Sequence, residues 1–194
     1  ICFYKVGSRD PETGSPWTVR DETIVWTRSH DDGLNWDPTE NVIYEDTSTR
    51  QEICCGNAYA RPDGTIMHAF YILNADYEER AKAENWSRIH LAVSRDRGRT
   101  WRTPQLDVPL ALAASFGGFL KLSDGTLLLN VYGAKEPGTF RHQSGIHRSS
   151  DEGETWGKAE FSGLEGGESG TCLRRLPSSN DVVLFFNNSK YNQE

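Results

Sequence analysis

The sequence predicts an all-β fold of four-stranded antiparallel sheets repeated along the chain, the architecture of a β-propeller. Two repeated motifs lead to this prediction. The first, S-x-D-x-G-x-(T/N)-W, occurs three times, with its aspartates at Asp31, Asp96 and Asp151. The second is an Asp-Gly turn between two apolar segments, as at 63–64 and 124–125, which is a strong hairpin signal. The motif period of about 60 residues suits one blade of four strands.

The composition supports this fold class and excludes others. The chain has 194 residues, 18 glycines, six tryptophans and one methionine, which suits a turn-rich β protein better than a helical one. Its net charge of -7 argues against a duplex nucleic-acid binder, which needs a basic surface. Apolar runs never approach the roughly 18 residues of a membrane span.

Each period is expected to contribute four strands in chain order, A to D. The inner strands A are predicted at 54–60, 116–122 and 171–176. Strands B follow the hairpin turns at 65–73, 126–132 and 182–187, and the opening segment 1–5 is expected to be another B strand. Strands C and D flank the eight-residue motif, with C at 22–28, 88–93 and 144–148 and D at 41–44, 105–108 and 158–161.

These strands divide the chain into blades. We expect a partial blade at 1–47, blades at 48–109 and 110–162, and a second partial blade at 163–194. The one helix-prone stretch, 77–85, lies between strands B and C of the second period and is interpreted as a long loop.

The residues of the eight-residue motif have structural explanations. The aspartate can accept backbone N–H bonds across the turn, the glycine can adopt positive φ, and the tryptophan can pack between blades. We therefore expect the aspartates to stabilise turns and not to act as catalytic acids. The residues concerned are Asp31, Gly33, Trp36, Asp96, Gly98, Trp101, Asp151, Gly153 and Trp156.

Three copies of this motif at this period resemble the Asp-box (BNR) repeats of the sialidase-like β-propellers. The resemblance implies a parent propeller of six blades, for which about three periods are present here. We therefore expect a portion of a longer protein or an incomplete propeller. The resemblance also implies a carbohydrate-active protein, a glycoside hydrolase acting on sialic acid or a related acidic glycan. The alternative is a non-catalytic propeller that binds glycan or protein through its long loops.

Propeller geometry places the long B–C and D–A connections on one face, where we expect any ligand site. Aligning the repeats brings Lys5, Tyr71, Tyr132 and Asn187 to one equivalent position at the end of strand B. The starts of the inner strands, including Glu52 and Ser115, point to the same face. The predicted substrate-binding residues are Lys5, Glu52, Tyr71, Tyr132 and Asn187.

Glu168 is the predicted catalytic residue. In the sialidase pattern a Glu that opens an inner strand takes the proton of a Tyr nucleophile, beside an acid Asp and three Arg that bind the substrate carboxylate. Segment 167–177 resembles the first half of this pattern. The second half departs from it, because Asn187 stands where an Arg is expected and no nucleophilic Tyr can be assigned. The missing groups would have to come from other blades.

The sequence gives no metal or cofactor site. Cys2, Cys54, Cys55 and Cys172 lack zinc-site spacing, so we expect buried free thiols, with one long-range disulfide as the alternative. We expect the protein to bind a glycan and not a nucleic acid. Open sheet edges also allow self-association. The compartment stays open, with a secreted or cell-surface location favoured.

Overall fold

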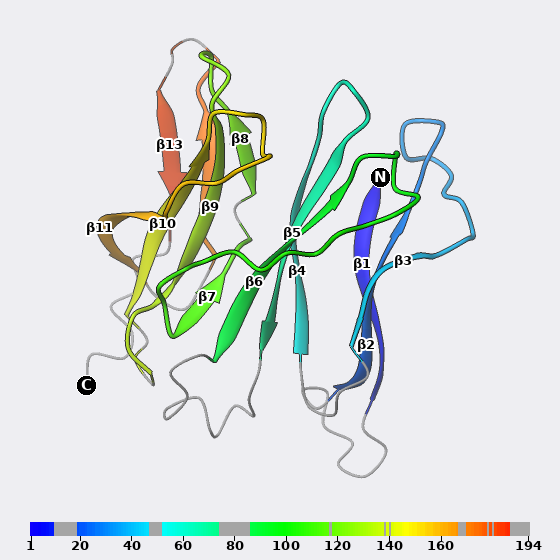
Figure 1. Cartoon of the computed structure of the whole chain (residues 1–194), viewed down its shortest axis with the longest axis horizontal. Helices are drawn as coiled ribbons and strands as arrows, with labels where there is room; N and C mark the ends of the chain where they lie inside the picture. Colours follow the sequence, from blue (N-terminus) through cyan, green and yellow to red (C-terminus); the bar gives the residue numbers. More distant parts are fainter. Residues whose placement is uncertain are drawn as a thin grey trace.

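The computed structural model describes residues 1–9, 19–46, 52–73, 86–116, 118–137, 139, 141–166, 170–177, 179 and 181–186. For several of these, Lys5, Glu52 and Cys55 among them, it describes the backbone only. Within these residues the chain forms strands and no helix, as Figure 1 shows, so the all-β prediction is confirmed. None of the described segments is a helix of the length and apolarity that crossing a membrane requires.

The strands form four antiparallel sheets in chain order. The first sheet contains β1 (Cys2–Arg9), β2 (Val19–Thr27) and β3 (Asn41–Asp46). The second contains β4 (Glu52–Ala60), β5 (Ile66–Leu73) and β6 (Ser87–Ser94). The third contains β7 (Leu112–Ala114), β8 (Phe119–Lys121), β9 (Leu127–Ala134), β10 (His142–Ser149) and β11 (Glu160–Gly166). The fourth contains β12 (Cys172–Arg175) and β13 (Val182–Phe185).

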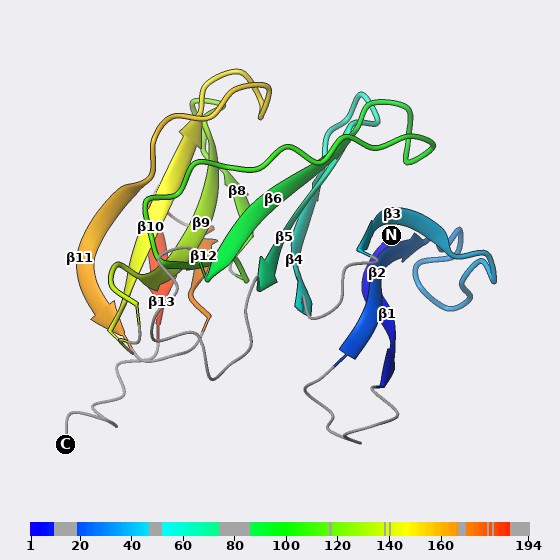
Figure 2. The same cartoon turned by 60° about the horizontal axis from the view of Figure 1, so that its bottom comes forward.

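Neighbouring sheets stand side by side and bury an apolar layer between them (Figures 1 and 2). Between the first and second sheets lies a cluster that includes Ile24, Trp26, Ile53, Phe70 and Ile72. Between the second and third lies one that includes Ala69, Tyr71, Ile89, Leu129 and Val131. Strand β9 is buried along its whole length because other sheets pack on both of its faces.

Two predicted strands are interrupted or reduced in the structure, whereas the others differ from the observed ones in their ends. The inner strand predicted at 116–122 is replaced by two short strands, β7 and β8, with a break between them where Gly118 has a φ of 75°. The outer strand predicted at 105–108 is reduced to one isolated bridge, His90 with Gln105, and a second bridge before it joins Val93 with Arg102. Pro104 lies between these bridges and has no N–H to contribute to a ladder. The predicted loop at 77–85 lies outside the described residues.

Cys2 and Cys172 are free thiols. The expectation of buried thiols is wrong for Cys2, which is exposed at the start of β1, while Cys54 and Cys172 are half-buried. The side chain of Cys55 is not described.

The three copies of the eight-residue motif are called Asp boxes here, and their glycines set how closely neighbouring sheets approach. A Cβ atom on Gly98 would lie 2.3 Å from the ring of Trp26 in the first sheet, and one on Gly153 would lie 2.5 Å from the sulfur of Met67 in the second. The second and third boxes therefore pack against the sheet that precedes each of them. The first box has no such neighbour in the described residues, and Trp36 is 44% exposed there.

Replacing Gly98 by alanine is expected to lower the free energy of unfolding by about 2–4 kcal/mol, because strain at a φ of 90° adds to a clash with Trp26. Gly125→Ala is the matched control. Its φ is 92°, but a Cβ there would meet nothing within 4 Å, so it should cost only about 1 kcal/mol. Urea denaturation measures both values, and equal losses would contradict the packing argument.

A second prediction concerns His68, which is fully buried and stacks on Phe3 at 4.3 Å between ring centroids. Burial lowers the pKa of His68 from 6.5 to about 4. The unfolded chain therefore binds more protons below pH 6.5, and stability should fall as the pH drops from 6.5 to 4, by an amount on the order of 3 kcal/mol. His68→Phe should reduce the slope of this part of a stability curve measured by denaturation at several pH values. An unchanged slope would show that His68 does not cause it.

Candidate functional site

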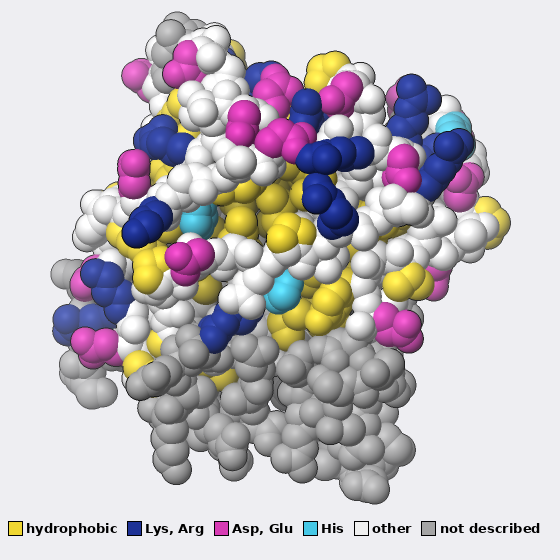
Figure 3. Space-filling model, viewed as in Figure 1, with side chains coloured by type: hydrophobic (Ala, Val, Ile, Leu, Met, Phe, Trp, Pro, Cys, Tyr) yellow, Lys and Arg dark blue, Asp and Glu magenta, His cyan; other side chains and the backbone are white. Residues whose placement is uncertain are grey.

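The two ends of the sheets have different chemistry. The Asp-Gly turns and the Asp boxes lie together at one end, which is the upper end in Figure 1 and is called the turn edge here. Strands β5 and β9 run from this edge to the opposite one, called the loop edge. Charged side chains gather toward the turn edge, above a more apolar middle region (Figure 3).

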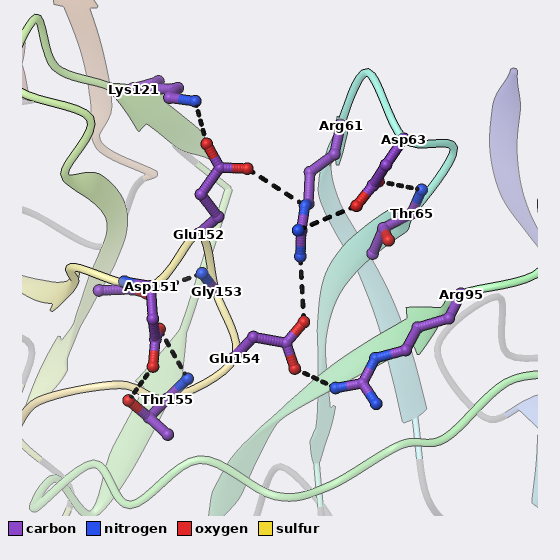
Figure 4. A network of polar contacts seen from close by, with 11 residues as sticks. Arg61, Asp63, Thr65, Arg95, Lys121, Asp151, Glu152, Gly153, Glu154 and Thr155 are labelled. Carbon is purple, nitrogen blue, oxygen red and sulfur yellow. Dashed lines mark hydrogen bonds and ion pairs between the residues drawn. The ribbon is translucent and has the colours of Figure 1, made fainter.

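An ion-pair network joins the second and third sheets at the turn edge (Figure 4). The Arg61 guanidinium lies 2.9 Å from Asp63, 3.3 Å from Glu152 and 3.0 Å from Glu154. Arg95 also pairs with Glu154, and Lys121 pairs with Glu152. The network therefore connects the Asp-Gly turn of the second sheet to the Asp box of the third, which gives these charges a structural explanation.

The three Asp boxes share one hydrogen-bond pattern. In the second box the Ser94 hydroxyl donates to the Asp96 carboxylate at 2.8 Å and accepts from the Gly98 N–H at 2.7 Å. The same carboxylate accepts from the Thr100 N–H at 2.9 Å and from the Thr100 hydroxyl at 2.7 Å. Boxes one and three repeat these contacts, with the Asn35 amide in place of the threonine hydroxyl in box one.

These contacts favour the ionised carboxylates. Hydrogen bonds, first from the side chain and then from the backbone of Asn35, lower the pKa of Asp31 to about 2. Thr100 and Thr155 have the same effect on the pKa values of Asp96 and Asp151, which are also about 2. A carboxylate of this kind is a poor general acid near neutral pH, which supports a structural role for the boxes.

Asp96→Ala is expected to lower the thermal midpoint at neutral pH, because the Thr100 N–H and hydroxyl lose their acceptor. The pKa of the folded state lies below that of the unfolded state, so the contribution is full above about pH 4 and disappears as the pH falls toward 2. The difference between wild type and variant in thermal melts should therefore shrink in acid. Asp107→Ala, at another exposed aspartate, is the control and should leave the midpoint unchanged.

Aromatic side chains converge at the loop edge. Phe116, which follows β7, lies edge-on to Tyr71 at the end of β5, with 5.4 Å between ring centroids. It stacks on Tyr132 near the end of β9 at 5.9 Å. Tyr71 and Tyr132 are 7% and 5% exposed, whereas Phe116 is 45% exposed. Two buried tyrosines therefore support one accessible ring, and these three residues are called the Phe116 platform.

Two further residues adjoin this platform. Gly170, directly before β12, approaches Phe116 so closely that a Cβ there would lie 2.9 Å from the Phe116 side chain. His142, at the start of β10, lies 5.8 Å from Tyr132 between ring centroids and is 4% exposed. Burial lowers the pKa of His142 to about 4, so its imidazole is neutral near pH 7. It therefore adds hydrogen-bonding capacity to this region without a positive charge.

The predicted binding residues are brought together only in part. Tyr71 and Tyr132 meet through Phe116. Lys5 lies in β1 opposite Ile24, and Glu52 begins β4 opposite Leu73, but their side chains are not described. Glu168 and Asn187 lie outside the described residues, so their roles remain predictions. Gly170, which contacts Phe116, follows Glu168 by two positions.

Sequence reasoning missed Phe116 and His142. Phe116 stood at the start of a predicted inner strand, directly after Ser115, but an apolar residue there gave no signal of exposure. Among the described residues, no group of three or more His, Cys, Asp or Glu side chains could hold a metal ion.

No protein-family model and no curated protein sequence matches the chain. Solved structures match it at low identity. An α-L-arabinanase from Penicillium chrysogenum has a TM-score of 0.62 at 18% identity over 92% of this chain and 55% of its own. The NanB sialidase from Streptococcus pneumoniae has a TM-score of 0.60 at 18% identity, over 88% of this chain and 24% of its own. A Trypanosoma rangeli sialidase has a TM-score of 0.58 at 16% identity, over 90% of this chain and 31% of its own.

The fold is that of part of a β-propeller. The chain spans between 24% and 55% of the length of these three structures. Glycoside hydrolases with different substrates, two sialidases and an arabinanase, share this propeller fold. At this level of identity the likeness establishes the architecture, and function has to be argued from the site.

Proposed function

We propose that this chain is part of a carbohydrate-active, sialidase-like protein that binds a glycan against the Phe116 platform. The observation that carries the proposal is the 45% exposure of Phe116, a ring supported by two buried tyrosines at the loop edge. The face of an aromatic ring is electron-rich and attracts the C–H groups on the apolar face of a sugar. Because both supporting tyrosines are buried, the platform is ordered before any ligand arrives, which lowers the entropic cost of binding.

We further propose that the protein is a glycoside hydrolase in which Glu168 takes a proton during the reaction. Support comes from the resemblance of segment 167–177 to the sialidase pattern and from the contact of Gly170 with Phe116. A Glu two residues before Gly170 is close in sequence to the proposed sugar site. The preferred substrate class is an acidic glycan such as a sialoside. Lys5, Glu52 and Asn187 are proposed as further binding residues on the same face.

A non-catalytic glycan-binding propeller is the second candidate. It is favoured by Asn187, which stands where the sialidase pattern has a substrate-binding Arg. An amide can hydrogen-bond a sugar hydroxyl, but it lacks the charge and the paired donors with which a guanidinium holds a carboxylate.

Phe116→Ala is expected to weaken glycan binding about tenfold, since an aromatic contact is worth up to about 1.5 kcal/mol. Isothermal titration of the full chain with 3′-sialyllactose and with arabinobiose measures this effect. Leu164→Ala is the matched control, because Leu164 is also 45% exposed but lies on the outer strand β11. The proposed site would be overturned if the wild type bound neither sugar, or if Phe116→Ala and Leu164→Ala lost the same amount of affinity.

Fluorogenic sialosides separate the two candidates. Hydrolysis that disappears in Glu168→Gln while sugar binding persists would support the enzyme. Binding without turnover in the correctly folded wild type would support the non-catalytic propeller.

A further inference from the structure

Asn130 is a fully buried amide in the middle of β9, a strand that otherwise carries mainly apolar side chains. Its side-chain oxygen accepts a hydrogen bond of 2.7 Å from the Thr171 hydroxyl, and its NH2 group donates one of 3.2 Å to the Gly145 carbonyl. Burying an amide costs free energy unless its hydrogen bonds are satisfied, and both ends of this one are. The side chain thus connects β9 and β10 of the third sheet with the segment that leads into β12.

The backbone of Asn130 holds the segment that carries Phe116. The Asn130 N–H donates to the Gly118 carbonyl at 3.1 Å, and the Asn130 carbonyl accepts from the Ser115 hydroxyl at 2.7 Å. These contacts fall on either side of Phe116 in sequence. The ladder with β9 pairs Ala114 with Tyr132 and is next recorded at Phe119 with Leu129, so the residues between depend on such contacts for their position.

The repeats provide an internal comparison. Aligning Tyr71 with Tyr132 places Ala69 at the position that corresponds to Asn130. Ala69 is fully buried and has no side-chain hydrogen-bonding group, so this position in a sheet does not itself require an amide. The third sheet differs from the second because Asn130 contacts both the segment that carries Phe116 and the segment Gly170–Thr171.

We infer that Asn130 is a positioning residue for the Phe116 platform. Its backbone fixes the segment on which Phe116 stands, and its side chain fixes Thr171 so that Gly170 packs against the Phe116 ring. The inference concerns the ordering of the platform, and its consequence for ligand affinity rests on the proposed function.

Thr171→Val tests this inference by replacing the hydroxyl with a methyl group of similar size, which leaves the Asn130 oxygen without that donor. Hydrogen–deuterium exchange should become about five- to tenfold faster in peptides that span residues 113–119, and affinity for 3′-sialyllactose or arabinobiose should fall by a similar factor. Thr171→Ser keeps the hydroxyl and should restore both values.

Thr27→Val is the matched control. Thr27 and Thr171 are each 6% exposed, and the Thr27 hydroxyl also donates a 2.7 Å hydrogen bond, in this case to the Asp37 carbonyl. Its loss should reduce overall stability without changing exchange at 113–119.

The two readouts keep the inference separate from the proposed function. If the wild type binds neither sugar, the proposed function fails, and exchange at 113–119 still decides the role of Asn130. The positioning role would be overturned if folded Thr171→Val showed the same exchange rate at 113–119 as Thr27→Val. Unchanged affinity in a variant whose segment 113–119 has become mobile would overturn its consequence for binding.

Discussion

The arrangement of the first three sheets depends on the close contacts that the glycines of the second and third Asp boxes make with the sheet before them. Gly98 meets Trp26, and Gly153 meets Met67, at distances that leave no space for a side chain. The box can present its glycine in this way because the aspartate and serine hold the turn through short local hydrogen bonds. Local turn chemistry therefore sets the distance between sheets, and the apolar clusters then fill the space that this distance creates.

This dependence explains why so much of the fold could be predicted from the sequence. The Asp-box and Asp-Gly signals act over fewer than ten residues, so they can be recognised without knowledge of the tertiary structure. The strands on either side follow from them because antiparallel neighbours must pair across each turn. The prediction was less accurate where a single residue interrupts pairing, as Pro104 does in the outer strand and Gly118 in the inner one.

The candidate site was less predictable because it is assembled from different sheets. The end-of-strand alignment selected Tyr71 and Tyr132, and both contact Phe116, since equivalent positions in adjacent sheets lie at the same edge. It could not select Phe116, because an exposed phenylalanine and a buried one look the same in a sequence. Phe116 lies between β7 and β8, and Ser115 and Gly118 on either side of it make hydrogen bonds with the backbone of Asn130 on a neighbouring strand.

Order at the loop edge also depends on contacts at the turn edge. Tyr71 belongs to the second sheet, whereas Phe116 and Tyr132 belong to the third, so their spacing is fixed only if the two sheets keep one relative orientation. The apolar layer alone leaves freedom to slide, because apolar contacts are not directional. Arg61 adds directional contacts at the turn edge, where it is 17% exposed and pairs with both Glu152 and Glu154 across the sheets. Charge pairing at one edge and stacked rings at the other thus act on the same pair of sheets, and both favour the one relative orientation in which Tyr71 and Tyr132 meet Phe116.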